Sequence, residues 1–299
     1  MKERTIYTLG FFDGVHLGHQ ALLLACRHLA RQAGCTPGAV TFTTHPEMLV
    51  QGKAPMLINS IEDRCWLLCG HGMAQIVQLP FDAALRSMPW RDFLQMLQDE
   101  HGAAGFVCGD DFRFGYRGEG NAQLLGDYCK ENNLPWAVVP AQSCDGIRIS
   151  STHIRRLLLE GRMEEAARFL GHPHILSGTV VKGRQLGRTI GIPTANLALP
   201  EGVICPKFGV YACTAVTEGM QYLAVTNIGT RPTVGGHHIT VEPRLLDFEG
   251  DLYGKPLMLY FHAFLRPEQK FVSLEQLQAE IQRNADQTRK LLEGTLRKN

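Results

Sequence analysis

Residues 1–140 alternate short apolar runs, rich in β-branched side chains, with longer stretches whose apolar positions recur every three or four residues. The runs that we expect as strands are 5–9, 38–42, 74–79, 104–108 and 136–139. Helical spacing covers 18–33, 61–72 and 90–98, and two short helices broken at Gly161 are expected over 152–170. Strands separated by helices are typical of parallel βαβ units, so this half predicts an α/β fold.

The pattern changes after residue 172, where β-branched runs follow one another with Gly, Pro and Asn between them. These runs are 176–181, 209–216, 222–228, 240–248 and 257–264. Closely spaced strands without intervening helices favour an antiparallel barrel or sandwich. A long helical pattern over 274–297 closes the chain. We therefore predict two domains, 1–172 and 173–299, which a length of 299 residues also favours.

Composition narrows the class of protein. The net charge is +1, which gives no electrostatic reason to expect nucleic acid or an anionic membrane as a partner. The first residues show no signal-peptide pattern, and no run approaches the roughly 18 apolar residues of a membrane span. Nine cysteines without C-x-x-C spacing fit reduced thiols better than disulfides or zinc. We expect a cytoplasmic protein that acts on small molecules, without a nucleic-acid, membrane or obligate protein partner.

The segment 10–19, GFFDGVHLGH, lies between the first expected strand and the first expected helix. Free amide groups and the dipole at such a helix start attract phosphates, so we expect an ATP site here. His16 and His19 could both donate hydrogen bonds to one phosphate chain. The other candidate nucleotide-binding positions of this turn are Gly10, Phe12, Gly14 and Gly18. A capped helix with two solvent-facing histidines would show the same pattern.

A second group of side chains suited to phosphate consists of Ser150, Ser151, Thr152 and Arg155. The hydroxyls lie at an expected helix start, and Arg155 can make a bidentate contact. Each of these features also has a plainer explanation. The hydroxyl run is equally typical of a helix cap, and the pair Asp110 and Asp111 is typical of a turn.

The second half carries oxygen donors suited to Mg²⁺ in Thr194 and Asn196. On an extended strand, residues two apart point to the same side, so both could reach one ion. Gly183 and Gly187 punctuate the basic segment before them, which could close over ATP phosphates, although a plain hairpin fits the bare spacing. Glu242 lies in a strand-like run where a carboxylate is unusual. It is therefore either a candidate general base or an exposed edge-strand residue.

Six ordered motifs resemble one family, the bacterial bifunctional riboflavin kinase/FMN adenylyltransferases, also called FAD synthetases. In the first half the motifs are 10–19, 109–115 (GDDFRFG) and 149–155 (ISSTHIR). In the second half they are 191–196 (GIPTAN), 227–233 (NIGTRPT), and Glu242 with 245–254 (LLDFEGDLYG). The resemblance covers essentially the whole chain. It implies a Rossmann-like nucleotidyltransferase domain with a parallel sheet, followed by an antiparallel β-barrel riboflavin kinase domain with a long C-terminal helix.

The resemblance also implies the chemistry. Riboflavin and ATP would give FMN in the second domain, and FMN and ATP would give FAD and pyrophosphate in the first, both with Mg²⁺. The histidine and hydroxyl clusters of the first domain would face each other over the triphosphate, with Asp111 helping to hold the adenylate or the flavin.

For the second domain, the resemblance implies that Thr194 and Asn196 bind Mg²⁺ and that Glu242 takes the proton from the ribityl hydroxyl of riboflavin. Arg266 is a candidate contact for the flavin end.

One segment departs from the family pattern. Where the family usually has Asp-Pro-His-Pro after its second strand, this chain has Thr43-Thr44-His45-Pro46. His45 is therefore either a flavin-binding residue or simply a loop histidine.

Two other classes of function stay compatible with parts of the sequence. One is a flavin-binding sensor without catalysis, which the joint presence of His16, His19, Thr194, Asn196 and Glu242 disfavours. The other is an RNA-linked nucleotidyltransferase, which the near-neutral charge and the lack of basic and aromatic clusters disfavour.

Overall fold

The computed structural model describes residues 3–45, 55–182, 194–233 and 236–295. Contacts divide the chain into two compact units. The first consists of Met1–Leu57 and Ile61–Ser151, and the second of Ile58–Ser60 and Thr152–Asn299. The boundary between functional domains expected at 172–173 stays a prediction, because this division follows compactness alone.

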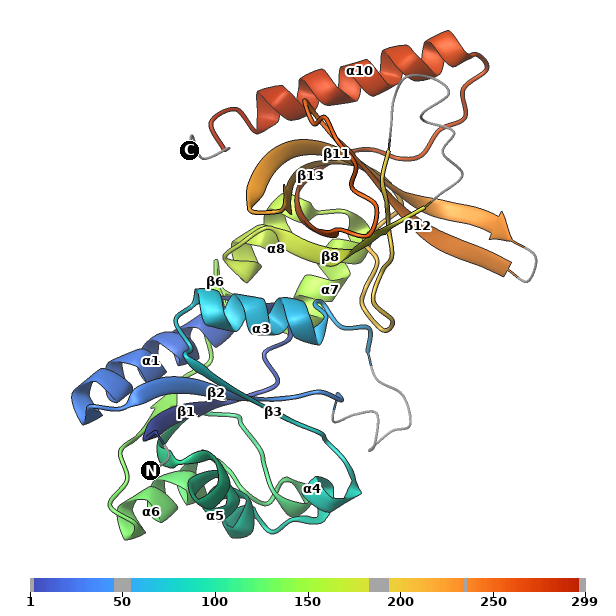
Figure 1. The fold of residues 1–299 in the computed structure, drawn as a ribbon. Helices are drawn as coiled ribbons and strands as arrows, with labels where there is room; N and C mark the ends of the chain where they lie inside the picture. Colours follow the sequence, from blue (N-terminus) through green and yellow to red (C-terminus); the bar gives the residue numbers. More distant parts are fainter. Residues whose placement is uncertain (1–2, 46–54, 183–193, 234–235, 296–299) are drawn as a thin grey trace. The chain divides into compact units, whose positions relative to one another are not determined.

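The first unit is built on a five-stranded parallel sheet (Figure 1). Its strands are β1 (Thr5–Leu9), β2 (Thr36–Phe42), β3 (Gln75–Leu79), β4 (Ala103–Gly109) and β5 (Trp136–Val139), in the order β3-β2-β1-β4-β5. β1 is buried along its whole length, as expected for a parallel strand covered on both faces. The strand order reverses between β1 and β4, and a crevice at the carboxyl ends of the strands is expected at such a point.

Helices cover both faces of this sheet (Figure 1). On one face lie α1 (Leu17–Ala33) and α3 (Ile61–Gly70), and on the other lie α4 (Ala83–Ser87), α5 (Trp90–His101) and α6 (Ala122–Glu131). The core between the sheet and the α5–α6 layer includes Tyr7, Phe106, Phe93, Leu97 and Leu125. Shorter elements are the 3₁₀ turns η1 (Asp13–Val15) and η2 (Tyr116–Gly118) and the hairpin of β6 (Ser143–Cys144) and β7 (Ile147–Arg148).

The predicted α/β architecture is confirmed, but the sequence pattern missed α4 and α6. Helix α6 contains Gly126 in its middle, which lowers its helical propensity. A Cβ atom at Gly126 would lie 2.9 Å from the indole Nε1 of Trp136, so close packing against β5 requires the glycine. The helix is stabilised at its start by Asn121, whose side chain accepts a 3.0 Å hydrogen bond from the Leu124 amide. Tertiary packing thus outweighs local propensity here.

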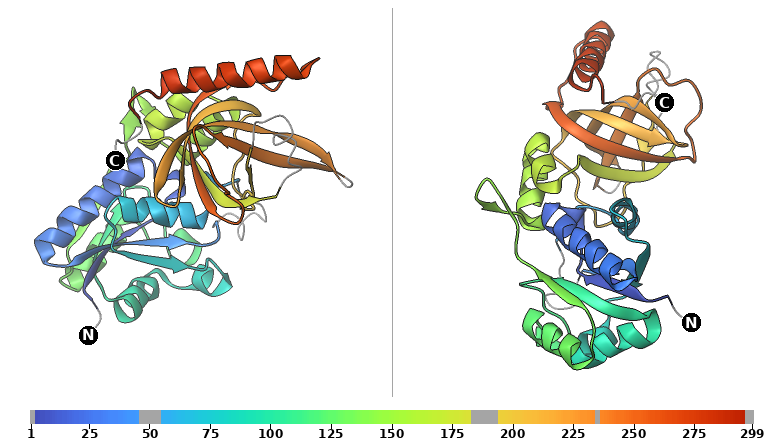
Figure 2. Two further views of the ribbon diagram at one scale, coloured as in Figure 1. Left: turned by 45° about the horizontal axis from the view of Figure 1, so that its top comes forward. Right: turned by 90° about the vertical axis from the view of Figure 1, so that its left-hand side faces the viewer.

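The second unit contains a closed antiparallel barrel, which confirms the predicted β-rich half (Figures 1 and 2). Its strands are β8 (His174–Val181), β9 (Asn196–Leu197), β10 (Gly209–Thr217), β11 (Met220–Thr233), β12 (Gly236–Leu245) and β13 (Pro256–Arg266). They close in the order β10-β11-β12-β9-β8-β13. In this closed order each strand has a neighbour on both sides, and buried side chains of the strands include Leu176, Leu259 and Phe261.

Several predicted element ends are wrong in this unit. β11 continues to Thr233 rather than ending at 228, and β12 begins at Gly236 rather than at 240. The strand expected over 240–248 ends at Leu245, because Asp247 adopts a left-handed φ of 58° that no strand accommodates. The helix expected over 274–297 ends at Leu291. Leu292 follows as the C-cap residue and is buried, which turns the chain back onto the barrel.

Among its described residues, the second unit also contains the helices α7 (Ser151–Glu160), α8 (Met163–Leu170) and α10 (Leu274–Leu291). The break predicted at Gly161 separates α7 from α8, with φ of 78° at the glycine. α8 packs on β8 and β13, and α10 packs across β10 and β11. Within the described ranges, no helix is long and apolar enough to span a membrane.

His174, at the start of β8, generates a prediction about stability. Its ring is 1% exposed, and burial lowers its pKa from 6.5 to about 3. The unfolded chain therefore binds a proton below pH 6.5 that the folded unit does not, so stability present at neutral pH is lost as the pH falls toward 3. The loss is about 1.4 kcal/mol per pH unit.

We expect His174→Leu to abolish this slope. Between pH 7 and pH 5 the unmodified protein should lose about 2 kcal/mol more unfolding free energy than the variant. Circular dichroism in urea measures the transition. All three tryptophans (Trp66, Trp90 and Trp136) lie in the first unit, so their fluorescence serves as a control that the variant should not alter. Equal acid sensitivity of both proteins would contradict the assignment.

Candidate functional site

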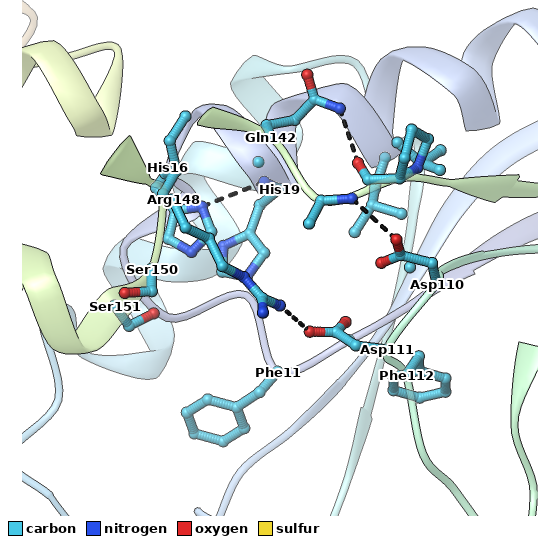
Figure 3. Close-up of a pocket in the computed structure, with 18 of the residues that line it drawn as sticks. Phe11, His16, His19, Asp110, Asp111, Phe112, Gln142, Arg148, Ser150 and Ser151 are labelled. Carbon is cyan, nitrogen blue, oxygen red and sulfur yellow. Dashed lines mark hydrogen bonds and ion pairs between the residues drawn. The ribbon is translucent and has the colours of Figure 1, made fainter. Parts of the chain in front are cut away.

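A cavity of about 490 Å³ lies at the carboxyl ends of β1, β4 and β5, beside the point where the strand order reverses (Figure 3). Three chain segments far apart in the sequence form its walls. The lining residues with polar or aromatic side chains are Phe11, His16, His19, Asp110, Asp111, Phe112, Gln142, Arg148, Ser150 and Ser151. Of the predicted glycines, Gly10 and Gly18 also line it.

The turn between β1 and α1 has an unusual backbone. Phe12, Gly14 and Val15 have φ angles of 58°, 81° and 40°. Positive φ is strained for an aromatic and especially for a β-branched residue. Phe12 and Val15 are fully buried, so core packing holds the conformation. Phe12 and Gly14, predicted as nucleotide contacts, do not line the cavity but shape the turn that does.

Side chains from three other segments bind the carbonyl groups of this turn. Thr41 donates to the Phe11 carbonyl at 2.9 Å, Ser151 to the Asp13 carbonyl at 3.0 Å, and Gln20 to the Val15 carbonyl at 2.9 Å. Ser151 is also a lining residue, so the hydroxyl cluster and the histidine turn are tied together directly. In the first unit, Ser150 and Ser151 therefore lie in the same cavity wall as the histidine turn, as predicted.

His16 and His19 lie side by side in the cavity wall (Figure 3). His16 is the N-cap of α1, and its Nδ1 accepts a 3.3 Å hydrogen bond from the His19 amide. The two rings stack with centroids 3.6 Å apart and planes 12° apart. A Cβ atom on Gly18 would lie 3.2 Å from the His16 ring, so the glycine makes room for it. Because Nδ1 of His16 is an acceptor, Nε2 carries the proton of the neutral ring.

The environment of His19 favours the neutral imidazole. Burial lowers its pKa well below 6.5, and the nearby His16 and Arg64 lower it further. Its Nδ1 has no hydrogen-bond partner among the described residues. A neutral ring can donate one hydrogen bond without the cost of placing a cation in this wall.

Arg64, on α3, is a feature that the sequence pattern did not reveal. Its side chain is 0% exposed, and Nη1 donates to the Phe42 carbonyl at 2.9 Å and to Thr41 Oγ1 at 3.2 Å. Its guanidinium lies 4.1 Å from the centroid of the Phe11 ring. Arg64 thus fixes the end of β2 and the aromatic wall of the cavity at once.

Two acidic residues follow β4 at the cavity rim. Asp110 accepts a 3.2 Å hydrogen bond from the Ala141 amide, which joins the ends of β4 and β5. Asp111 forms an ion pair with Arg148, and Figure 3 shows these side chains pointing toward each other. The side chains of Asp111 and Arg148 are both largely exposed, so their ion pair is weak and another charged group can displace either partner. Arg148 was not predicted, because it lies just before the recognised segment 149–155.

Besides Phe12 and Gly14, three more predicted site residues of the first domain do not line this cavity. Thr152 and Arg155 lie on α7 in the second unit. The His45 ring packs edge-on against the lining residue Phe11, with centroids 4.7 Å apart, and is not itself a lining residue. Pro46, the next residue of that segment, lies outside the described residues.

The second unit has a cavity of about 300 Å³ between the barrel and α10. It contains the predicted Glu242, Thr194 and Arg266, which lie far apart in the sequence. Glu242 stands directly opposite Asn227 in the β11–β12 register, and Asn227 donates a long 3.5 Å hydrogen bond to Glu268. The apolar part of the wall consists of Val210, Val225, Phe271, Leu277 and Ile281.

Thr194 also lines a smaller cavity of about 80 Å³ beside Phe248 and Tyr253. Ala195 is buried, its amide donates to the Pro243 carbonyl at 2.9 Å, and it lines this smaller cavity together with Thr194. Asn196 begins β9 but lines neither cavity. Gly183 and Gly187 lie outside the described residues.

Comparisons with known proteins agree over both halves of the chain. The FAD synthetase family model matches residues 1–153, and the riboflavin kinase family model matches residues 170–292. A bifunctional riboflavin kinase/FMN adenylyltransferase of Listeria monocytogenes is 34% identical over 95% of this chain and 91% of its own length. The Escherichia coli protein of the same name is 37% identical over the same shares.

A solved structure agrees in fold. A crystal structure described as a macrolide-efflux protein from Streptococcus pneumoniae is 30% identical, with a TM-score of 0.86, and the match covers 97% of this chain and 95% of that one. The match over both halves, at this identity and coverage, confirms the resemblance predicted from six motifs. The chain therefore belongs to the bifunctional riboflavin kinase/FMN adenylyltransferase family, and it combines these two activities.

Proposed function

We propose that each activity belongs to one cavity. In the first unit, the 490 Å³ cavity beside His16 and His19 would bind ATP and FMN for adenylyl transfer. In the second unit, the 300 Å³ cavity containing Glu242 would bind riboflavin for phosphorylation by a second ATP. The observation that carries this proposal is that each cavity gathers the predicted donors or base of one reaction from distant parts of the sequence.

In the first unit, an FMN phosphate oxygen attacks the α-phosphorus of ATP, and pyrophosphate leaves. The transition state places negative charge on oxygens around phosphorus, which fixed donors stabilise without a covalent intermediate. His16 Nε2, the neutral His19 ring and the Ser150 hydroxyl are the donors that we assign to these oxygens. Arg148 would join them by exchanging its weak pair with Asp111 for a phosphate.

In the second unit, the ribityl hydroxyl of riboflavin attacks the γ-phosphorus of ATP, and ADP leaves. Glu242 accepts the hydroxyl proton as the new O–P bond forms. The apolar side of the cavity, Val210, Val225, Leu277 and Ile281, offers a surface of the right chemistry for the flavin ring. Arg266, in the same cavity, is the candidate contact for the polar edge of that ring.

The second unit has oxygen atoms that fit Mg²⁺. Thr194 and Asn196 supply neutral oxygens, which suit an ion whose remaining ligands are nucleotide phosphates and water. We assign the ion to these residues because Thr194 lines both the 300 Å³ and the 80 Å³ cavity. When bound, Mg²⁺ would neutralise charge on the phosphates. Gly183 and Gly187 for ATP, Thr152 and Arg155 for its phosphates, and His45 for the flavin remain predictions.

We also propose that the protein works in the cytoplasm on small molecules, without nucleic acid, membrane or an obligate protein partner. The balanced charge supports this, as do the nine cysteines, which all lie among the described residues as free thiols.

The test is a product assay. The protein, riboflavin, ATP and Mg²⁺ are incubated, and riboflavin, FMN and FAD are separated by chromatography. Both FMN and FAD should form, and FMN supplied alone with ATP should yield FAD and pyrophosphate. Absence of both flavin nucleotides from well-folded protein would overturn the proposal.

The histidine pair generates one prediction. His19→Ala should lower the rate of FAD formation from FMN about 10²–10³-fold, the usual effect of removing a transition-state donor. Riboflavin phosphorylation by the same sample should be unchanged. His16→Asn is the sharper companion variant, because asparagine keeps the helix cap while removing the imidazole. His28→Ala, an exposed histidine of the same helix, is the matched control. Equal loss of both activities in His19→Ala would argue against separate sites.

Glu242 generates the converse prediction. Glu242→Gln keeps the shape of the side chain but cannot accept a proton, so kcat for FMN formation should fall about 10²–10⁴-fold. FAD formation from added FMN should stay at the unmodified rate. Glu249→Gln, at an exposed position after β12, is the control. If Glu242→Gln phosphorylates riboflavin normally, the base is another group.

A further inference from the structure

The two halves of helix α10 differ in how deeply they are buried against the barrel. Its second half is anchored by the buried residues Asn284, Ala285 and Thr288. In its first half no residue is buried, and only Leu277, Glu280 and Ile281 are half-buried. Leu277 and Ile281 form one wall of the riboflavin cavity. This half therefore contributes directly to the site while having little packing of its own to hold it there (Figure 2 shows α10 across the barrel).

An ion pair holds this half of the helix to the barrel. Arg266 Nε, at the end of β13, lies 3.1 Å from Glu280 Oε1, and the two side chains are only 18% and 12% exposed. Nε also lies 3.4 Å from Asn284 Oδ1, one turn further along the helix. Nη1 of the same guanidinium donates to the Pro267 carbonyl at 3.0 Å. Arg266 is thus oriented by the helix on one side and by its own loop on the other.

Glu280 is held in turn by Arg283, whose Nη1 lies 2.7 Å from Glu280 Oε2. Both carboxylate oxygens are therefore engaged, which fixes the rotamer of a side chain that is mostly removed from water. Burial lowers the pKa of Arg266, and the charge of Glu280 opposes that shift. Removing one partner of such a pair leaves the other charge poorly compensated, so the contact would open rather than persist.

We propose that Glu280 is a positioning residue for riboflavin phosphorylation: through Arg266 it holds the first half of α10 as the apolar wall of the cavity. Glu280 does not line the cavity itself, and it acts by fixing Leu277, Ile281 and the guanidinium of Arg266. The inference rests on the proposed assignment of riboflavin to this cavity. It predicts an effect on binding of the flavin and none on the step in which Glu242 takes the proton.

The test uses the full-length protein and compares Glu280→Gln and Glu280→Met with the unmodified chain. The methionine variant keeps most of the side-chain volume, so a loss of packing is separated from a loss of charge. Asp286→Asn is the matched control, since Asp286 is an exposed carboxylate on the same helix, paired with Arg289. Adenylyltransferase activity on added FMN and circular dichroism melting report on the integrity of each sample.

Both Glu280 variants should raise the KM for riboflavin roughly five- to tenfold, because the apolar wall formed by Leu277 and Ile281 would no longer be held in place. The kcat should stay within about twofold, and KM for ATP and FAD formation from FMN should be unchanged. Asp286→Asn should match the unmodified enzyme. A normal KM for riboflavin, or a fall in kcat at constant KM, would overturn the inference. Failure of the unmodified protein to phosphorylate riboflavin would instead overturn the assignment of the cavity.

Discussion

The backbone conformation from Phe12 to Val15 is the constraint on which the first site depends. Three of its four residues have positive φ, and two of those three carry side chains that disfavour it. Burial of Phe12 and Val15 fixes the turn, and hydrogen bonds from Thr41, Gln20 and Ser151 satisfy its carbonyl groups. Only with the turn in this shape does His16 cap α1 and stack on His19. Packing in the core therefore compensates for the strain of this turn, and the strained turn places the two histidines in the cavity wall.

The two units meet the same chemical demand in different ways. In the reaction assigned to the first, the acceptor is a phosphate that is already ionised, so the proposed site needs donors around phosphorus and no base. In the second, the acceptor is an alcohol, which must lose a proton, and a carboxylate on a barrel strand is assigned to that step. The parallel sheet offers a helix start at its switch point, whereas the barrel offers alternating side chains on extended strands.

The sequence predicted the features of the two sites that lie within a few consecutive residues. The strand-turn-helix context of residues 10–19, the hydroxyl run at Ser150, and Glu242 in its strand are each contained within a few residues. It did not predict Arg64 or Arg148, because a buried arginine stacked on Phe11 and an arginine paired across a cavity depend on segments meeting in three dimensions. The sequence did not predict the role of α10 for the same reason. Its periodicity predicts a helix, but only the contact of Glu280 with Arg266 indicates that its first half is held against the barrel as a wall of the cavity.

The central claim is that one chain catalyses the attack of two different flavin oxygens on two different phosphorus atoms of ATP. Tracing labelled phosphorus tests it most directly. The protein is supplied with riboflavin, Mg²⁺ and ATP carrying radioactive phosphorus at either the γ or the α position. The account predicts that the γ label appears in FMN and is retained in FAD, whereas the α label appears in FAD and never in FMN. An α label in FMN, or FAD that carries no α label, would contradict it.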